Sequence, residues 1–296
     1  GGVFQSSGTF TRTVGTAAGN VNWSTSSGGF SAIGGALNVQ LNGGTGSVTW
    51  NGASMVSTGQ TLIFGSASAD SMVDWQNSLN LGSSGSGQRT IQVVDNSNST
   101  TDIARISGSI TNTAAGWGII KTGNGTLELT GTNTYTGGTT VSEGILLING
   151  DNSAATGAIS VAAGAYLGGT GTIGADLNFA ATSLFEIADI NDPLAVTGTV
   201  TFGSGFGIAN LAGIDWNALD LNTAYTLIST SQTFTSGDIS NFGAANAAPV
   251  GGGRSAYFQS GSLQLVVVPE PAALALAGLG IAGIASVIRR RRKASN

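Results

Sequence analysis

The 296-residue chain contains no cysteine and no histidine. Without cysteine it forms no disulfide, holds no cysteine-based zinc site and performs no thiol catalysis. Without histidine it lacks the commonest general base, the base of serine-hydrolase triads and the commonest transition-metal ligand. These two absences exclude many hydrolase mechanisms.

Charge is also scarce, since only 8% of the residues are charged. Five of the ten basic residues stand together near the end of the chain, as Arg289, Arg290, Arg291, Arg292 and Lys293. Residues 1–271 therefore carry five basic and 15 acidic side chains, a net charge of −10. An acidic body does not bind nucleic acid through a basic patch, so we expect no nucleic-acid partner. Cations or neutral glycans suit it better.

Helical periodicity is almost absent before Ala272, because the 48 glycines interrupt every candidate helix. Apolar and polar residues alternate instead in short runs, as in Leu37–Leu41 and Val196–Phe202, and this alternation is typical of strands with one buried face. Glycine-flanked runs recur at roughly 15–25 residues, about one coil of a solenoid. The sequence predicts an all-β protein and favours a parallel β-helix over a sandwich or a barrel.

The end of the chain has three parts in order: Pro269-Glu270-Pro271, an uncharged apolar run over 272–288, and the basic cluster 289–293. As a helix, the apolar run spans roughly 26 Å, the short end of what crosses a bilayer. The basic cluster then stays on the cytoplasmic side and the body lies outside. This arrangement resembles the PEP-CTERM sorting signal of exported bacterial proteins. The resemblance implies a membrane protease of the exosortase type as partner, which cuts near the triplet.

Residues 121–150 resemble the autotransporter-associated β-strand repeat, also called the passenger-associated transport repeat. The likeness rests on Lys121-Thr122-Gly123, Gly125-Thr126-Leu127, Leu129, Gly131, Asn133-Thr134-Tyr135-Thr136-Gly137, Thr139-Thr140-Val141, Gly144 and Leu147. It implies coils of a right-handed β-helix. From the alternation, we expect Leu127, Leu129, Val141, Ile145 and Leu147 to point inward, and Tyr135 to cover a turn with its hydroxyl in water.

Chemistry-bearing residues are few. Asp189, Asn191 and Asp192 are a candidate calcium site, because Ca²⁺ takes hard oxygen ligands, but we favour a polar turn before Pro193. A polysaccharide-cleaving site would need carboxylates and an arginine to converge across coils. The candidates are Asp70, Asp74, Asp95 and Asp102 with Arg89 and Arg105. The five tryptophans would form a sugar-stacking platform or, as we favour, pack in the core. No cofactor is expected.

The predicted division is a segment or cap at 1–22, a solenoid at 23–184, closing coils at 185–268 and a sorting tail at 269–296, with triplet 269–271, transmembrane helix 272–288 and basic end 289–293. We expect an exported, non-catalytic surface or extracellular-matrix protein with a structural or adhesive role. It is held in the inner membrane before trimming, and exopolysaccharide or envelope glycans are candidate partners. The alternative is a polysaccharide-binding or polysaccharide-cleaving β-helix. Converging carboxylates and an arginine on one face favour the alternative; bare Thr, Ser and Asn faces favour the structural role.

Overall fold

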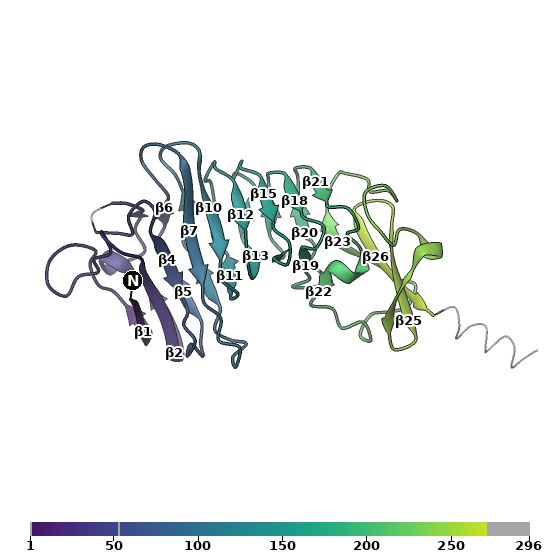
Figure 1. The fold of residues 1–296 in the computed structure, drawn as a ribbon, viewed down its shortest axis with the longest axis horizontal. Helices are drawn as coiled ribbons and strands as arrows, with labels where there is room; N and C mark the ends of the chain where they lie inside the picture. Colours follow the sequence, from purple (N-terminus) through teal and green to yellow (C-terminus); the bar gives the residue numbers. More distant parts are fainter. Residues whose placement is uncertain (1, 53, 271–296) are drawn as a thin grey trace, which may run out of the picture.

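The computed structural model describes residues 2–52 and 54–270, and their regular structure is almost entirely β-strand (Figure 1). The helical segments in this part of the chain are three short 3-10 turns, at Leu41–Gly43, Ile208–Asn210 and Ala244–Asn246. Among these described residues, no helix has the length and apolar character needed to cross a membrane. The helix predicted over 272–288 lies outside the described residues.

The strands stack along the long axis of the molecule as a parallel solenoid whose coils present three faces (Figure 1). The first face contains β4 (Thr61–Phe64), β7 (Gly87–Val93), β10 (Trp117–Thr122), β12 (Thr139–Val141), β15 (Ile159–Val161), β18 (Leu177–Phe179) and β21 (Val200–Phe202). The second face contains β5 (Val73–Trp75), β8 (Ala104–Ile106), β11 (Thr126–Leu129), β13 (Ile145–Ile148), β16 (Tyr166–Gly168), β19 (Leu184–Glu186) and β22 (Leu211–Ala212). The third face contains β3 (Val48–Thr49), β6 (Leu79–Asn80) and β9 (Ile110–Thr111), followed by β14 (Asp151–Asn152), β17 (Thr172–Ile173), β20 (Leu194–Val196) and β23 (Ala224–Ser229).

One long strand joins the first two faces at the start of the solenoid. β2 (Gly28–Val39) pairs with β4 through its first residues and with β5 through its last. Between these stretches lie Gly34 and Gly35, at φ +70° and +144°, a backbone conformation that glycine adopts without a Cβ clash. β1 (Val3–Phe10) pairs with β2 as a further parallel strand. The strands of the first and second faces, together with β2 and β1, make one 16-stranded sheet.

The core is a set of inward rows in which one residue from each coil stacks on its counterpart in the next. On the second face, Trp75, Ile106, Leu129 and Ile148 form one such row. All four side chains are fully buried. A single coil has no second layer to cover its apolar side, so this stacking is what removes the row from water.

Glycine at the corners permits the close approach of successive coils. A Cβ on Gly157 would lie 2.1 Å from the carbonyl oxygen of Gly137, and a Cβ on Gly137 would lie 2.4 Å from the amide nitrogen of Gly118. These three glycines belong to successive coils, so the same corner excludes side chains in each of them. This contact explains part of the high glycine content.

An antiparallel sheet closes the far end. Parallel pairing continues past residue 185 to β23, which then pairs antiparallel with β26 (Leu263–Pro269). β25 (Arg254–Gln259) and β24 (Ala248–Gly251) extend this sheet. A cluster of aromatic rings packs against the last coils, and it contains Phe179, Phe202, Phe206 and Phe234. The open end of the core is thereby covered.

Two predictions about the repeat were wrong. Ile145 and Leu147 do not point inward: β13 pairs with β11 so that Leu146 lies opposite Leu127, and both of these are fully buried. The run Ile-Leu-Leu-Ile has no polar residue to mark its outer face, and only the register decides. Tyr135 is 1% exposed, and its hydroxyl lies 2.6 Å from Thr139 Oγ1 rather than in water.

The register of β13 against β11 predicts that Leu146 contributes more to stability than its neighbour Leu147. We expect Leu146→Ala to destabilise the protein by about 2–5 kcal/mol, because it leaves a cavity in a stacked row. Leu147→Ala removes the same atoms from a partly exposed side chain on the outer face, and we expect a loss below about 1 kcal/mol. Urea unfolding of both variants measures the difference. Equal losses, or a larger loss for Leu147→Ala, would contradict the register.

Candidate functional site

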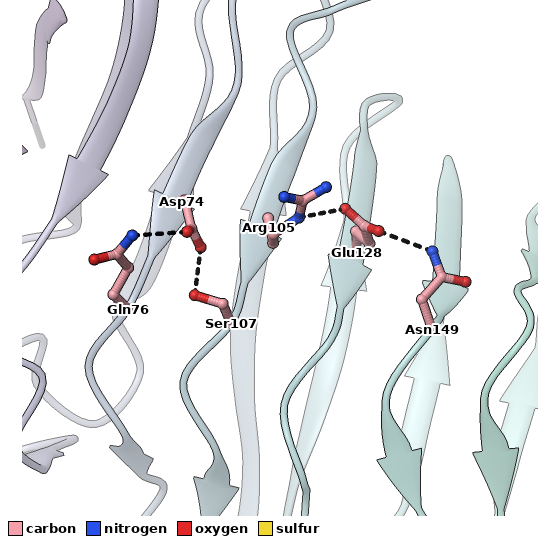
Figure 2. Close-up of polar contacts among 6 residues, drawn as sticks. All are labelled: Asp74, Gln76, Arg105, Ser107, Glu128 and Asn149. Carbon is pink, nitrogen blue, oxygen red and sulfur yellow. Dashed lines mark hydrogen bonds and ion pairs between the residues drawn. The ribbon is translucent and has the colours of Figure 1, made fainter. Parts of the chain in front are cut away.

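Three charged residues occupy equivalent positions on neighbouring strands of the second face (Figure 2). Arg105 lies opposite Asp74 on one side and opposite Glu128 on the other. Each points outward because the residues beside it on its strand, such as Leu127 and Leu129, point into the core. Two carboxylates and an arginine therefore converge on one face of the solenoid; we call Asp74, Arg105 and Glu128 the charged row.

The carboxylates of the charged row are already engaged by neighbouring side chains (Figure 2). Ser107 Oγ and Gln76 Nε2 donate to Asp74 over 2.6 and 2.9 Å. Arg105 Nε and Asn149 Nδ2 donate to Glu128 over 2.7 and 2.8 Å. Asp74 and Glu128 are each only 8% exposed. The row thus links coils to one another through hydrogen bonds that lie along the sheet surface.

This geometry limits what the row does chemically. A general acid or base must reach the proton it transfers in a bound substrate. Both oxygens of each carboxylate accept hydrogen bonds from the protein, and the Arg105 guanidinium is paired with Glu128. The side chain of Arg105 is 33% exposed and is the more accessible part of its ion pair. The arrangement suits cross-coil attachment better than proton transfer.

The other acidic candidates lie apart from the charged row. Asp70 accepts a hydrogen bond from the Gly34 amide at 2.7 Å, and Asp102 accepts one from the Asn96 amide at 2.8 Å. Asp95 is exposed. These contacts fix loops between coils, so the structure does not gather the predicted carboxylates into a single site.

The candidate calcium residues form a turn. Asp189 Oδ1 accepts a hydrogen bond from the Asn191 amide at 2.9 Å, and the Asp192 amide donates to the Asp189 carbonyl. All three residues are exposed. Within residues 2–52 and 54–270, no group of three or more His, Cys, Asp or Glu side chains could hold a metal ion. The calcium site stays a prediction, and the geometry is that of an Asx turn.

The tryptophans do not make an open sugar-stacking surface. Trp50, Trp75 and Trp117 are between 0% and 7% exposed. Trp23 and Trp216 are only partly buried and pack against the core. The rings therefore fill the interior of the coils and its corners.

The alternation of apolar and polar residues did not reveal that Lys121 is buried. In the first face it takes an inward position between Ile91 and Val141, and it is fully buried. Its ammonium donates to three carbonyls at a corner, those of Thr122, Gly123 and Glu143, over 3.1, 2.6 and 3.0 Å. Burial lowers its pKa to about 7, although the nearby Glu143 carboxylate opposes the shift. Lys121 therefore fastens two successive coils where a hydrophobic residue would leave these carbonyls without a donor.

The first residues of the sorting triplet belong to the folded body. Pro269 ends β26 and lies opposite Arg254, and the Glu270 amide donates to the Gly253 carbonyl at 2.9 Å. Pro271 and the basic cluster Arg289, Arg290, Arg291, Arg292 and Lys293 lie outside the described residues. The folded body thus includes the first two residues of the predicted tail.

Stacked coils with a closed C-terminal end define a parallel β-solenoid protein. Comparisons with known proteins agree with both resemblances. Residues 119–148 match the passenger-associated-transport-repeat, and residues 267–292 match the PEP-CTERM protein-sorting motif. A similar curated protein is the adhesin BmaC autotransporter of Brucella suis biovar 1 (strain 1330), with 48% identity over 82 residues. That match covers 28% of this chain and 2% of the adhesin. No solved structure matches the chain.

The low pKa of Lys121 predicts a specific pH dependence of stability. The folded state releases the Lys121 proton near pH 7, whereas the unfolded chain holds it up to about 10.5, the ordinary pKa of a lysine side chain. The unfolded state thus binds more protons between these values, and the free energy of unfolding rises with pH there, by at most about 1.4 kcal/mol per pH unit. Below pH 7 both states hold the proton and this slope vanishes.

Lys121→Met removes this titration. We expect the variant to be less stable at every pH, because three carbonyls lose their donor, but to lack the rise between pH 7 and 9. The absence of histidine and cysteine leaves few other side chains that titrate in this window. Urea unfolding of both proteins at several pH values measures the slopes. Parallel curves would contradict the assignment.

Proposed function

We propose that this chain is an exported, non-catalytic surface protein whose right-handed β-helix serves a structural or adhesive role. The observation that carries the proposal is the direct succession of a closed solenoid and a sorting motif. The cap is completed by β26, which ends at Pro269, and the sorting match covers 267–292. The repeat match and the adhesin relative support a surface role for the body. The right-handed sense follows the general preference of parallel crossover connections.

Residues 269–296 then act as a sorting signal. Its apolar run over 272–288 spans the inner membrane, with the basic cluster 289–293 on the cytoplasmic side. An exosortase-type membrane protease removes this segment near the triplet. A cut after Glu270 leaves every strand of the cap in place, since β26 ends at Pro269. The trimmed body then reaches the cell surface or the extracellular matrix.

The outer row of the first face supports a structural or adhesive role. Register places Thr61, Thr90, Ile120, Thr140, Ser160, Asn178 and Thr201 in one outward row. Most of these side chains carry a hydroxyl or an amide and none is charged. Such a surface forms hydrogen bonds with neutral glycans or with other envelope components at little desolvation cost.

A second candidate function is polysaccharide binding or cleavage, and the charged row of Asp74, Arg105 and Glu128 favours it. Two carboxylates and an arginine on one face are the composition that such a site needs. Cleavage is disfavoured because both carboxylates already accept hydrogen bonds from protein side chains. We therefore place binding without turnover above catalysis.

The sorting role predicts the C-terminus of the mature protein. In the native host we expect the extracellular form to end near 269–271 and the membrane form to include Asn296. Glu270→Ala with Pro271→Ala should keep the tail and hold the protein in membranes. Asp192→Ala with Pro193→Ala changes another acidic-proline pair, in an exposed turn, and should be trimmed normally. Intact mass and C-terminal peptide mapping of each fraction test this. Wild-type protein that keeps Asn296 and stays in membranes would contradict sorting.

The non-catalytic role predicts no turnover of polysaccharides. We expect no new reducing ends, and no unsaturated product from β-elimination, when the full chain is incubated with neutral and uronate-containing polysaccharides. Asp74→Asn with Glu128→Gln serves as the matched control, because it removes both carboxylates of the charged row with little change in volume. Product from the wild type that disappears in this variant would establish an enzyme and overturn the proposal.

A further inference from the structure

A buried arginine occupies the corner between the third and first faces. Arg89 is 4% exposed and takes an inward position opposite Ile119. Its guanidinium carbon lies 3.7 Å from the ring centroid of Trp117 and 5.7 Å from that of Trp50. Arg89 Nε donates to the Leu81 carbonyl at 2.8 Å. The arginine thus lies between rings that come from different coils.

The charge of Arg89 has no anionic partner within the described residues. The ion pair found there joins Arg105 to Glu128, and Arg89 has no carboxylate within 4.0 Å. Arg89 Nη1 donates to Thr58 Oγ1 at 3.2 Å. Its Nη2 makes no hydrogen bond in this part of the chain, and it is not among the atoms that are buried without a partner. Burying a cation without an anion is costly, and cation–π contacts return only part of that cost.

The guanidinium faces a hollow that is built to be polar. Its volume is about 160 Å³, and its lining includes Arg89, Trp50, Trp117, Thr58, Ser83 and Ser84. The Nε1 atom of Trp50 is buried and has no partner among the described residues. The hollow, which we call the Arg89 cavity, therefore offers a cation, hydroxyl groups and two indole rings.

We propose that the Arg89 cavity binds the carboxylate of a sugar acid. A carboxylate accepts charge-assisted hydrogen bonds from a guanidinium. The N–H groups of Arg89 Nη2 are available to donate such bonds. Hydroxyl groups of Ser83, Ser84 and Thr58 suit the ring hydroxyls of the same sugar. The net charge of −10 over residues 1–271 disfavours highly charged anions, so a group with a single charge fits best. The source is either a free uronate or a uronate residue within a glycan.

This inference rests on the proposed surface role only for the source of the ligand. Binding of a free sugar acid is measured on purified protein and does not depend on sorting or trimming. Failure of the tail to be processed would leave the Arg89 cavity unaffected, and failure of binding would leave the sorting role unaffected.

The test is a titration of the full chain, in mild detergent, with D-glucuronate. Tryptophan fluorescence is the readout, because two indole rings line the cavity. We expect a saturable change with glucuronate and none with D-glucose, which has the same ring without the carboxylate. Acetate, which has a carboxylate without a ring, should bind more weakly. A uronate-containing oligosaccharide distinguishes the sources: if it competes with glucuronate, the ligand is a glycan, and if it does not, the ligand is the free acid.

Two substitutions of Arg89 and one control substitution test the role of the guanidinium. Arg89→Lys retains a charge but loses the planar fork, and we expect it to weaken glucuronate binding about tenfold or more. Arg89→Met should abolish binding, with circular dichroism and thermal melting as the check on folding. Arg12→Gln removes an exposed arginine elsewhere and should leave binding unchanged. Equal responses to glucuronate and glucose, equal affinity for acetate and glucuronate, or undiminished binding by folded Arg89→Lys would overturn the assignment.

Discussion

Each coil of this protein buries its apolar side only by stacking in register on the next coil. The inward rows, such as Trp75, Ile106, Leu129 and Ile148, exist because parallel pairing places equivalent residues one above another. Backbone hydrogen bonds and side-chain burial thus depend on the same alignment. Glycine at shared corners, as at Gly137 and Gly157, is required because side chains there would meet the carbonyls of neighbouring coils.

Polar groups in the interior serve the same alignment. Lys121 takes one inward position and donates to three corner carbonyls, so a polar group is kept where apolar residues occupy neighbouring positions of the row. On the outer surface, the charged row joins coils through the hydrogen bonds of Ser107, Arg105 and Asn149. A buried polar group is retained at low cost when its partners are fixed in place. Arg89 differs, because part of its guanidinium has no hydrogen-bond partner among residues 2–52 and 54–270 and faces a hollow.

The strand β26, which ends the cap of the solenoid, overlaps the match to the PEP-CTERM sorting motif. A parallel stack ends in an open edge, and here the antiparallel strands β24 to β26 continue the sheet of the third face as far as Pro269. The match to the sorting motif therefore begins within the last strand of the folded body.

The sequence alone determined the strand content, the repeat near Lys121 and the sorting motif, because these depend on local alternation, glycine spacing and short motifs. It did not determine which residues of β13 point inward: Ile145 to Ile148 are all apolar, and only pairing with β11 selects Leu146 and Ile148. The charged row and the Arg89 cavity were likewise decided by the tertiary structure. Their residues lie in different coils of unequal length, so stacking, rather than spacing along the chain, brings them together.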